Sequence, residues 1–94
     1  MLVLNRKTNE GFIINGSTEL NVVGIKGTTV VMELKENGKD THKITAVLNY
    51  EGRKIAVGNS YMTISVLHTS GTIARLGFDA PKDISIVRKE LLGK

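Results

Sequence analysis

The sequence predicts an all-β protein made of short antiparallel strands. Apolar and polar residues alternate in several segments, as around Ile64 and Val66, which is the pattern of strands with one buried face. Turn-forming pairs such as Asn15-Gly16 separate these segments at regular intervals. The chain has 94 residues, enough for one domain, so we expect residues 1–94 to share a single core.

Nine strands follow in order from these patterns. The first five end at turn sequences and are expected at residues 1–7, 11–15, 19–26, 29–35 and 41–50, with turns at Thr8-Asn9-Glu10-Gly11, Asn15-Gly16, Lys26-Gly27 and Asn37-Gly38. The last four are expected at residues 53–57, 61–68, 72–78 and 83–87, separated by Gly58-Asn59, Ser70-Gly71 and the loop that contains Pro81. At Asn15-Gly16 we expect a type I′ turn, in which both central residues have positive φ. Residues 88–92 alone look helical, and they predict a short C-terminal helical turn.

The composition excludes several classes of function. The chain has no Cys, which rules out disulfides, thiolate metal sites and cysteine nucleophiles. His42 and His68 are far apart and have no neighbouring ligand pattern, so we expect neither a metal site nor catalysis there. No apolar run approaches the length of a membrane span, and Met1-Leu2-Val3-Leu4 is too short for a signal peptide. We therefore expect a cytoplasmic protein that is not an enzyme and needs no cofactor.

The net charge is mildly positive, at +4. The excess lies near the two ends of the chain, in Arg6-Lys7 and in a later group formed by Lys82, Arg88, Lys89 and Lys94. Such a bias suits a polyanionic partner, although many ordinary domains share it.

Fragments of the sequence recur at an offset of 44 residues. Val3-Leu4-Asn5 matches Val47-Leu48-Asn49, and further matches join Asn15 to Asn59, Val22 to Val66 and Gly27-Thr28 to Gly71-Thr72. The matches cluster at strand starts and turns, which favours an internal duplication with pseudo-repeats at 1–44 and 45–94. The alternative is that any series of hairpins reuses Val, Asn and Gly at similar spacing.

Both ends of the sequence resemble one known family, the carbon storage regulators of bacteria. Met1-Leu2-Val3-Leu4-Asn5-Arg6-Lys7 resembles the opening strand of that family, followed by Glu10 and by Val23-Gly24-Ile25-Lys26-Gly27. The rest of the family pattern begins at Gly71 and runs through Arg75-Leu76-Gly77-Phe78-Asp79-Ala80-Pro81-Lys82-Asp83-Ile84-Ser85-Ile86-Val87-Arg88-Lys89-Glu90. Together the two ends cover about half of the chain. The most specific part is Gly77-x-x-Ala80-Pro81-Lys82 followed by alternating apolar residues and Arg88.

The resemblance implies a particular architecture. Members of the family form dimers of two interleaved protomers, and each RNA site lies where the first strand of one protomer meets the last strand of the other. This chain resembles such a dimer fused into one polypeptide, as an interleaved antiparallel two-sheet barrel or sandwich. We therefore expect a monomer, with a homodimer as the alternative. Arg6 and Arg88 would lie at one retained RNA edge, and the degenerate second edge would carry Tyr50 and Ile44 in their places.

The resemblance also implies the function. The family binds GGA motifs in single-stranded or hairpin-loop RNA, in messenger RNA leaders or regulatory small RNAs, and represses translation. Arg88 is the first candidate, for guanine or phosphate, and Arg6 and Lys7 are expected to hold phosphates. Leu4 and Ile86 would support bases. Asn5 and Val87 depart from the family pattern, which puts base preference in doubt. The expected RNA-binding residues are Leu4, Asn5, Arg6, Lys7, Ala80, Pro81, Lys82, Ile84, Ile86, Val87 and Arg88.

Each of these residues also has an ordinary structural role open to it. Leu4, Ile84 and Ile86 fit a core pattern, and charges such as Arg88 discourage pairing between sheet edges. The alternative function is that of a family relative that has lost RNA binding and acts through contacts with other proteins. The presence of both Arg6 and Arg88 argues against that alternative.

Overall fold

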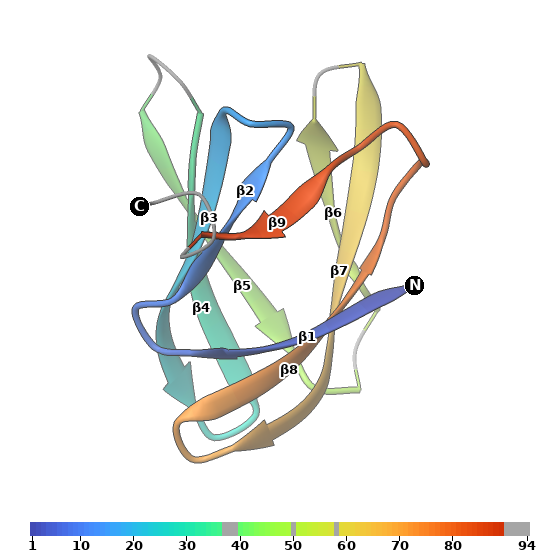
Figure 1. The fold of residues 1–94 in the computed structure, drawn as a ribbon. Helices are drawn as coiled ribbons and strands as arrows, with labels where there is room; N and C mark the ends of the chain where they lie inside the picture. Colours follow the sequence, from blue (N-terminus) through green and yellow to red (C-terminus); the bar gives the residue numbers. More distant parts are fainter. Residues whose placement is uncertain (37–39, 50, 58, 90–94) are drawn as a thin grey trace.

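The computed structural model describes residues 1–36, 40–49, 51–57 and 59–89, and these residues form two antiparallel sheets (Figure 1). The first sheet, sheet A, has the order β1-β8-β7-β6, and the second, sheet B, has the order β5-β4-β3-β2-β9. The strands are β1 (Leu2–Lys7), β2 (Gly11–Ile14), β3 (Thr18–Lys26), β4 (Thr29–Lys35), β5 (Thr41–Val47), β6 (Arg53–Val57), β7 (Ser60–Ser70), β8 (Ile73–Asp79) and β9 (Ile86–Arg88). The all-β prediction with two antiparallel sheets is confirmed.

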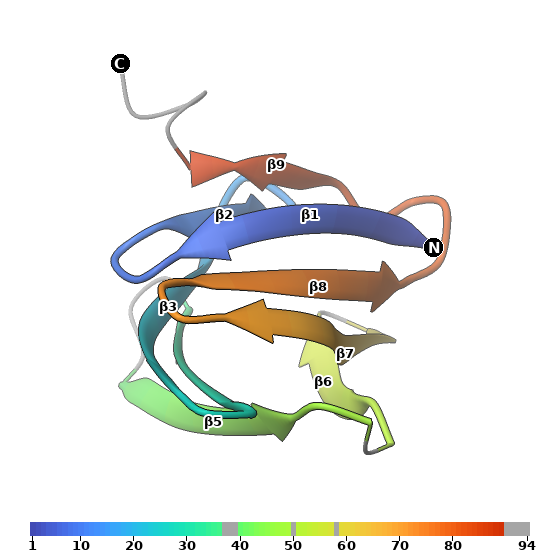
Figure 2. The same ribbon diagram turned by 90° about the horizontal axis from the view of Figure 1, so that it is seen from below.

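The two sheets exchange their outer strands. β1 comes from the start of the chain but pairs with β8, while β9 comes from the end of the chain and pairs with β2. Each sheet is therefore completed by a strand from the opposite half of the sequence. As a result, β1 and β9 lie next to each other along one side of the molecule, each at the edge of its own sheet (Figure 2).

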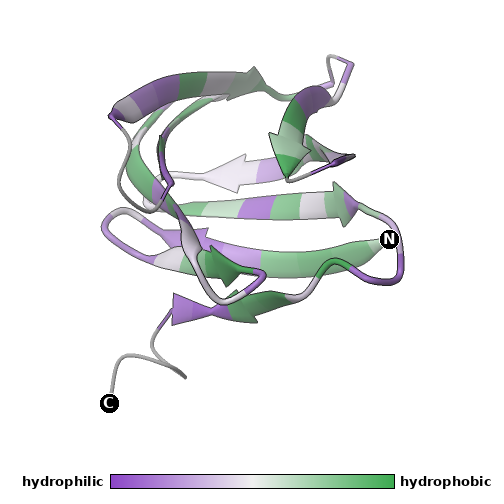
Figure 3. Cartoon of the chain, turned by 90° about the horizontal axis from the view of Figure 1, so that it is seen from above, coloured by the Kyte–Doolittle hydropathy of each residue, from purple (hydrophilic) through white to green (hydrophobic). Residues whose placement is uncertain are grey.

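The core lies between the sheets and consists of aliphatic residues and two phenylalanines. Alternate residues of every long strand point inward, as Val30, Met32 and Leu34 do on β4. Phe12 and Phe78, one from each sheet, meet edge to face with ring centroids 4.7 Å apart. Green apolar segments alternate with polar ones along these strands in Figure 3. One cluster joins the buried residues of both sheets, so the described chain has one shared core.

The strands agree with their predicted ranges to within two residues, except for two strands. A third difference concerns the predicted helical turn. The strand predicted at 41–50 ends at Val47, because Leu48 and Asn49 form a turn in which Asn49 has φ of 64°. The strand predicted at 83–87 is β9 at Ile86–Arg88, since the chain before it turns to reach β2. Arg88 belongs to that strand and not to the predicted helical turn, and residues 90–92 of that turn lie outside the described residues.

The turn predictions are partly confirmed. Asn15 and Gly16 both have positive φ, 52° and 75°, as a type I′ turn requires. Gly27 and Gly71 also adopt positive φ at the two later hairpins. Asn37-Gly38 and Gly58 lie outside the described residues.

The central hairpins of the two sheets repeat one another at the offset of 44 residues. In β3–β4, Val22 pairs with Met32, and in β7–β8, Val66 pairs with Leu76. Both hairpins shift register directly afterwards, between Val22 and Gly24 and between Val66 and His68. This shared bulge extends the match beyond residue identity to backbone geometry.

The outer strands follow a different offset, which corrects two predicted equivalences. In sheet A, Arg6 pairs with Ala74. Val30 lies 44 residues before Ala74 and corresponds to it in sheet B, where Val30 pairs with Ala46. Ala46 therefore occupies the place of Arg6 in sheet B, and the predicted counterpart Tyr50 lies outside the described residues. Ile44, predicted as the counterpart of Arg88, pairs with Met32 and so corresponds to Leu4. The offset of 44 does not hold for β5, because this strand ends at Val47 and the following turn begins earlier than predicted.

Candidate nucleic-acid interface

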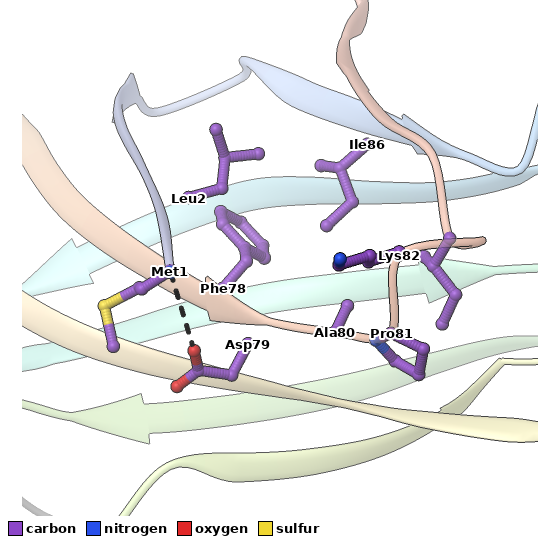
Figure 4. A pocket seen from close by; sticks show the side chains of 9 residues that line it. Met1, Leu2, Phe78, Asp79, Ala80, Pro81, Lys82 and Ile86 are labelled. Atoms are coloured by element: carbon purple, nitrogen blue, oxygen red, sulfur yellow. Dashed lines mark ion pairs between the residues drawn. The ribbon is translucent and has the colours of Figure 1, made fainter.

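A groove of about 310 Å³ lies between the outer strands β1 and β9. Its walls come from the start of β1, the end of β8, the following loop and the start of β9 (Figure 4). The residues that line it are Met1, Leu2, Phe78, Asp79, Ala80, Pro81, Lys82, Ile84 and Ile86. The strand exchange creates this groove, because it brings residues from both ends of the sequence to one place.

β1 divides its side chains between the interior and the outer face of sheet A. Leu4 is partly buried and packs on the core, while Leu2 is exposed and lines the groove. Asn5 and Lys7 are exposed and lie on the opposite side of the strand. Of the predicted β1 residues, Lys7 and Asn5 are therefore accessible to a ligand from the outer face.

Arg6, which was predicted to hold a phosphate, is a buried residue. Its side chain is buried, at 5% exposure. The guanidinium donates hydrogen bonds to the carbonyl oxygens of Asn5 (2.7 Å) and Gly11 (3.4 Å), and its Nε lies 3.8 Å from Glu10 Oε1. The same group lies 5.6 Å from the centre of the Phe12 ring. Arg6 thus ties β1 to the turn that follows it.

The loop between β8 and β9 is held in a defined shape by two sets of hydrogen bonds. The N–H of Ile84 donates to the carbonyl of Pro81 at 3.1 Å, which closes a turn. The N–H of Ser85 donates to Asn15 Oδ1, and the N–H of Asn15 donates to the carbonyl of Ser85, both at 2.9 Å. These bonds fix the point at which the chain joins β2. They leave Ala80, Pro81 and Lys82, three of the residues predicted to contact RNA, exposed beside the groove (Figure 4).

β9 presents alternate residues to the groove and to the outer face of sheet B. Ile84 and Ile86 are partly buried, pack on the core and line the groove. Val87 pairs with Ile13 and Arg88 pairs with Phe12. Arg88 is exposed and lies on the same side of the strand as Ile86. The predicted β9 residues therefore lie together, with an apolar surface that leads to an accessible guanidinium.

A surface ion pair holds the end of β9 in place. Lys89 Nζ lies 2.8 Å from Glu19 Oε1 on β3 and 3.3 Å from Asn21 Oδ1. The hydrogen bond from Lys89 lowers the pKa of the Glu19 carboxyl, aided by the positive charges of Lys89 and Lys35, against the opposing effect of partial burial. Lys89 is thus engaged in structure, which leaves the neighbouring Arg88 as the exposed cation of β9.

The arrangement combines three features that suit single-stranded nucleic acid. The groove has an apolar floor that can support bases, as Leu2, Phe78 and Ile86 show in Figure 4. Lys82 lies beside one end of it, and Lys7 and Arg88 lie toward the other end of β1 and β9. Both strands are edges of their sheets within the described residues, so their outer N–H and C=O groups face away from the ladders.

Four residues that line the groove were missed by the sequence reasoning: Met1, Leu2, Phe78 and Asp79. The alternation of Leu2 with Leu4 was a signal for Leu2. Phe78 could be predicted as a lining residue only if the pairing of β1 with β8 were known, because Leu2 lies opposite Phe78 in that pair of strands. At the mouth, the terminal amino group of Met1 lies 4.0 Å from Asp79 Oδ1. This contact offsets the negative charge of Asp79 next to the groove.

Two other kinds of feature are absent from the described part of the chain. No group of three or more His, Cys, Asp or Glu side chains there is placed to hold a metal ion. Nor do the described residues include a helix with the length and apolar character needed to cross a membrane. The β1–β9 groove is therefore the candidate functional site.

Comparison with known proteins gives one match. Residues 49–94 match the model of the CsrA family, described as the global regulator protein family. The matched part contains β6 to β9, and with them the groove residues from Phe78 to Ile86 and Arg88. No curated protein and no solved structure matches the chain.

The fold and groove define a small all-β protein with a groove shared between two sheet edges. Its C-terminal part, residues 49–94, is similar to the CsrA family of global regulators. The family resemblance read from the sequence is thereby confirmed for this part of the chain.

Proposed function

We propose that the protein binds single-stranded RNA in the β1–β9 groove and acts as a post-transcriptional regulator. The observation that carries this proposal is the position of exposed cations, Lys82 and Arg88, around a groove that has apolar side chains on its floor and lies between two open strand edges. The match of residues 49–94 to the model of a family of global regulators supports it. The cytoplasm would be its place of action, and translational repression its effect.

Each part of the groove has a role in the proposed complex. Bases of a GGA-type loop lie on Leu2, Phe78 and Ile86, and their edges bond to main-chain groups of the strands and of the Ala80-Pro81 loop. Arg88 donates a bidentate pair of hydrogen bonds to guanine or phosphate. Lys7 and Lys82 hold phosphates on either side. Arg6 acts indirectly, because it positions β1 and is buried.

A titration with a labelled GGA hairpin tests the proposal. We expect saturation at one RNA per chain, because the described residues contain one place where β1, at the edge of sheet A, lies beside β9, at the edge of sheet B. A hairpin of the same stem with CCA in its loop is the matched control and should bind more weakly. Saturation at two RNA molecules per chain would contradict the single-groove proposal. Equal affinity for both loops would contradict GGA recognition.

The salt dependence of that affinity tests the phosphate contacts. Three phosphates neutralised by Lys7, Lys82 and Arg88 predict a slope of roughly −2 for log affinity against log salt, from about −0.7 per phosphate on a single strand. A flat response would show that these cations do not contact phosphate. Absence of any RNA binding would favour the alternative, a regulator that acts through contacts with other proteins.

A further inference from the structure

We propose that the outer edge of β6 binds an extended acidic segment of a partner protein as an added strand of sheet A. This site lies apart from the β1–β9 groove, since β1 and β6 form the two opposite edges of the sheet. The inference therefore goes beyond RNA binding and can be tested separately from it.

β2 and β6 are equivalent strands with different surroundings. β2 lies beside β3 in sheet B, and β6 lies beside β7 in sheet A. The far edge of β2 is covered by β9, through pairs formed by Phe12, Ile13 and Ile14. In sheet A no described strand covers β6, which is the last strand of that sheet (Figure 1). Sheet A therefore has one strand fewer than sheet B, and the missing place is next to β6.

The registers show which residues of β6 correspond to those of β2. Phe12 pairs with Leu20, and Arg53 pairs with Ile64, which lies 44 residues after Leu20. The glycine before each pair supports the same alignment. A Cβ on Gly11 would lie 2.5 Å from the Leu20 carbonyl oxygen, and a Cβ on Gly52 would lie 3.4 Å from the Ile64 carbonyl oxygen.

By the same register, Lys54 and Ile55 on β6 correspond to Ile13 and Ile14 on β2. An added strand in the place that β9 takes in sheet B would then face Ile55, Lys54 and Arg53 in turn.

The side chains of β6 specify the chemistry of that strand. Ile55 is buried on the core side, whereas Arg53 and Lys54 are exposed. Neither cation forms a salt bridge with a described residue, and Lys54 lies 5.3 Å from the centre of the exposed Tyr61 ring. Opposite charges placed directly across an antiparallel ladder stabilise the pair. The added strand is therefore expected to carry an apolar residue opposite Ile55, followed by acids opposite Lys54 and Arg53.

Charge also argues against a second copy of this chain at the same place. Pairing of two β6 strands about Ile55 would bring two copies of Arg53 and of Lys54 into one short ladder. Cations on an edge strand are a common means of preventing such self-association. An acidic peptide converts the same charges into attraction, and it also satisfies the backbone groups of the edge.

The test uses fluorescent eight-residue peptides and the full chain. A peptide with Ile-Glu-Glu at its centre should bind saturably, and the matched peptide with Ile-Lys-Lys should bind at least ten-fold more weakly. The double variant Arg53→Glu/Lys54→Glu should reverse this preference. Lys26→Glu/Lys43→Glu changes charge equally, at exposed positions of sheet B, and should leave the preference unchanged. If the reversed variant keeps the original preference, the peptide binds elsewhere and the proposal is wrong.

A scan with N-methylated peptides tests the strand geometry. In an added strand, successive N–H groups point alternately toward β6 and toward solvent, so methylation at alternate positions should weaken binding and the positions between should tolerate it. Uniform effects would overturn strand addition. Displacement of the peptide by excess GGA hairpin would place it in the RNA groove and also overturn the proposal. So would a doubled mass in light scattering caused by pairing of β6 between two chains.

Discussion

Arg6 and Arg88 are both neighbours of Phe12 but differ in what surrounds them. Arg6 is buried against Phe12 and bonds two carbonyl oxygens, whereas Arg88 is the exposed cross-strand neighbour of Phe12. The sequence predicted both residues at one RNA edge, and the structure places them on β1 and β9. It could not distinguish their roles, because burial of Arg6 depends on the turn to Gly11 and on the packing of the opposite sheet.

Replacement of Arg88 should therefore affect binding and leave stability unchanged. Loss of a charge-assisted contact costs about 1.5–3 kcal/mol, or roughly ten- to a hundred-fold in affinity. We expect Arg88→Ala to lower the affinity for the GGA hairpin by that factor with an unchanged melting temperature. Lys43→Ala on β5 is the control and should bind RNA normally. Full RNA binding by Arg88→Ala would remove the proposed role of this residue.

Replacement of Arg6 should act through stability. Arg6→Ala leaves the Gly11 carbonyl without this donor and removes the contact with Phe12, for a loss of about 1–3 kcal/mol in the free energy of unfolding. Urea denaturation measures this loss. RNA binding, measured where the variant is still fully folded, should weaken less than in Arg88→Ala. An unchanged unfolding curve together with complete loss of RNA binding would instead make Arg6 a direct contact.

Gly11 provides a second test of local packing. A Cβ there would lie 2.3 Å from Asn21 Oδ1 and 2.5 Å from the Leu20 carbonyl oxygen, while a Cβ on Gly24 would meet nothing within 4 Å. Gly11→Ala should therefore destabilise the protein by about 1–3 kcal/mol, as overpacking does. Gly24→Ala, the matched control, should change stability by less than about 1 kcal/mol. Comparison of the two urea midpoints checks the difference.

At the scale of the element, local sequence patterns predicted the strands and turns that local backbone preferences determine. Alternation located the strands, and Asn15-Gly16 marked a turn whose two positive φ angles are now observed. Errors occurred where distant contacts set the boundary. β9 begins later than predicted because Asn15 and Ser85, 70 residues apart, bond to each other and fix where the chain meets β2. No pattern within 83–87 contains that information.

The docking of β9 should depend on acidity through Glu19. Its lowered pKa means that the pair with Lys89 stabilises the fold above the ordinary value near 4.5 and that this contribution is lost as pH falls through the lowered pKa. Both side chains are partly exposed, so the contribution is about 0.2–1 kcal/mol. We expect Glu19→Gln to be less stable than the unaltered protein at neutral pH and equally stable at strongly acidic pH. Lys89→Met should behave similarly. A constant difference at all pH values would show that the ion pair is not its cause.

At the scale of the whole molecule, the site depends on the exchange of outer strands. The family resemblance predicted that β1 and β9 would meet, and composition or periodicity alone would not have done so. The register then revised the proposed repeat: the hairpins match at an offset of 44, while Ala46 and not Tyr50 takes the place of Arg6. The description of the chain as a fused dimer stays a prediction.

That description has a direct test in the mass of the protein. Both sheets and their shared core are supplied by one chain in the described structure, so we expect a monomer at micromolar concentration. Light scattering measures this mass. A dimer would support the alternative in which two chains exchange strands, and the groove would then need to be reassigned to pairs of chains.

The exchange of outer strands also affects the timing of synthesis. β1 is the first described strand to leave the ribosome and β9 is the last, so the groove cannot close until translation has passed Arg88. β1 must meanwhile wait for β8, its partner from the far end of the sequence. If the groove binds RNA as proposed, a nascent or prematurely terminated chain should not bind RNA, and only a polypeptide that includes β9 should act as a regulator.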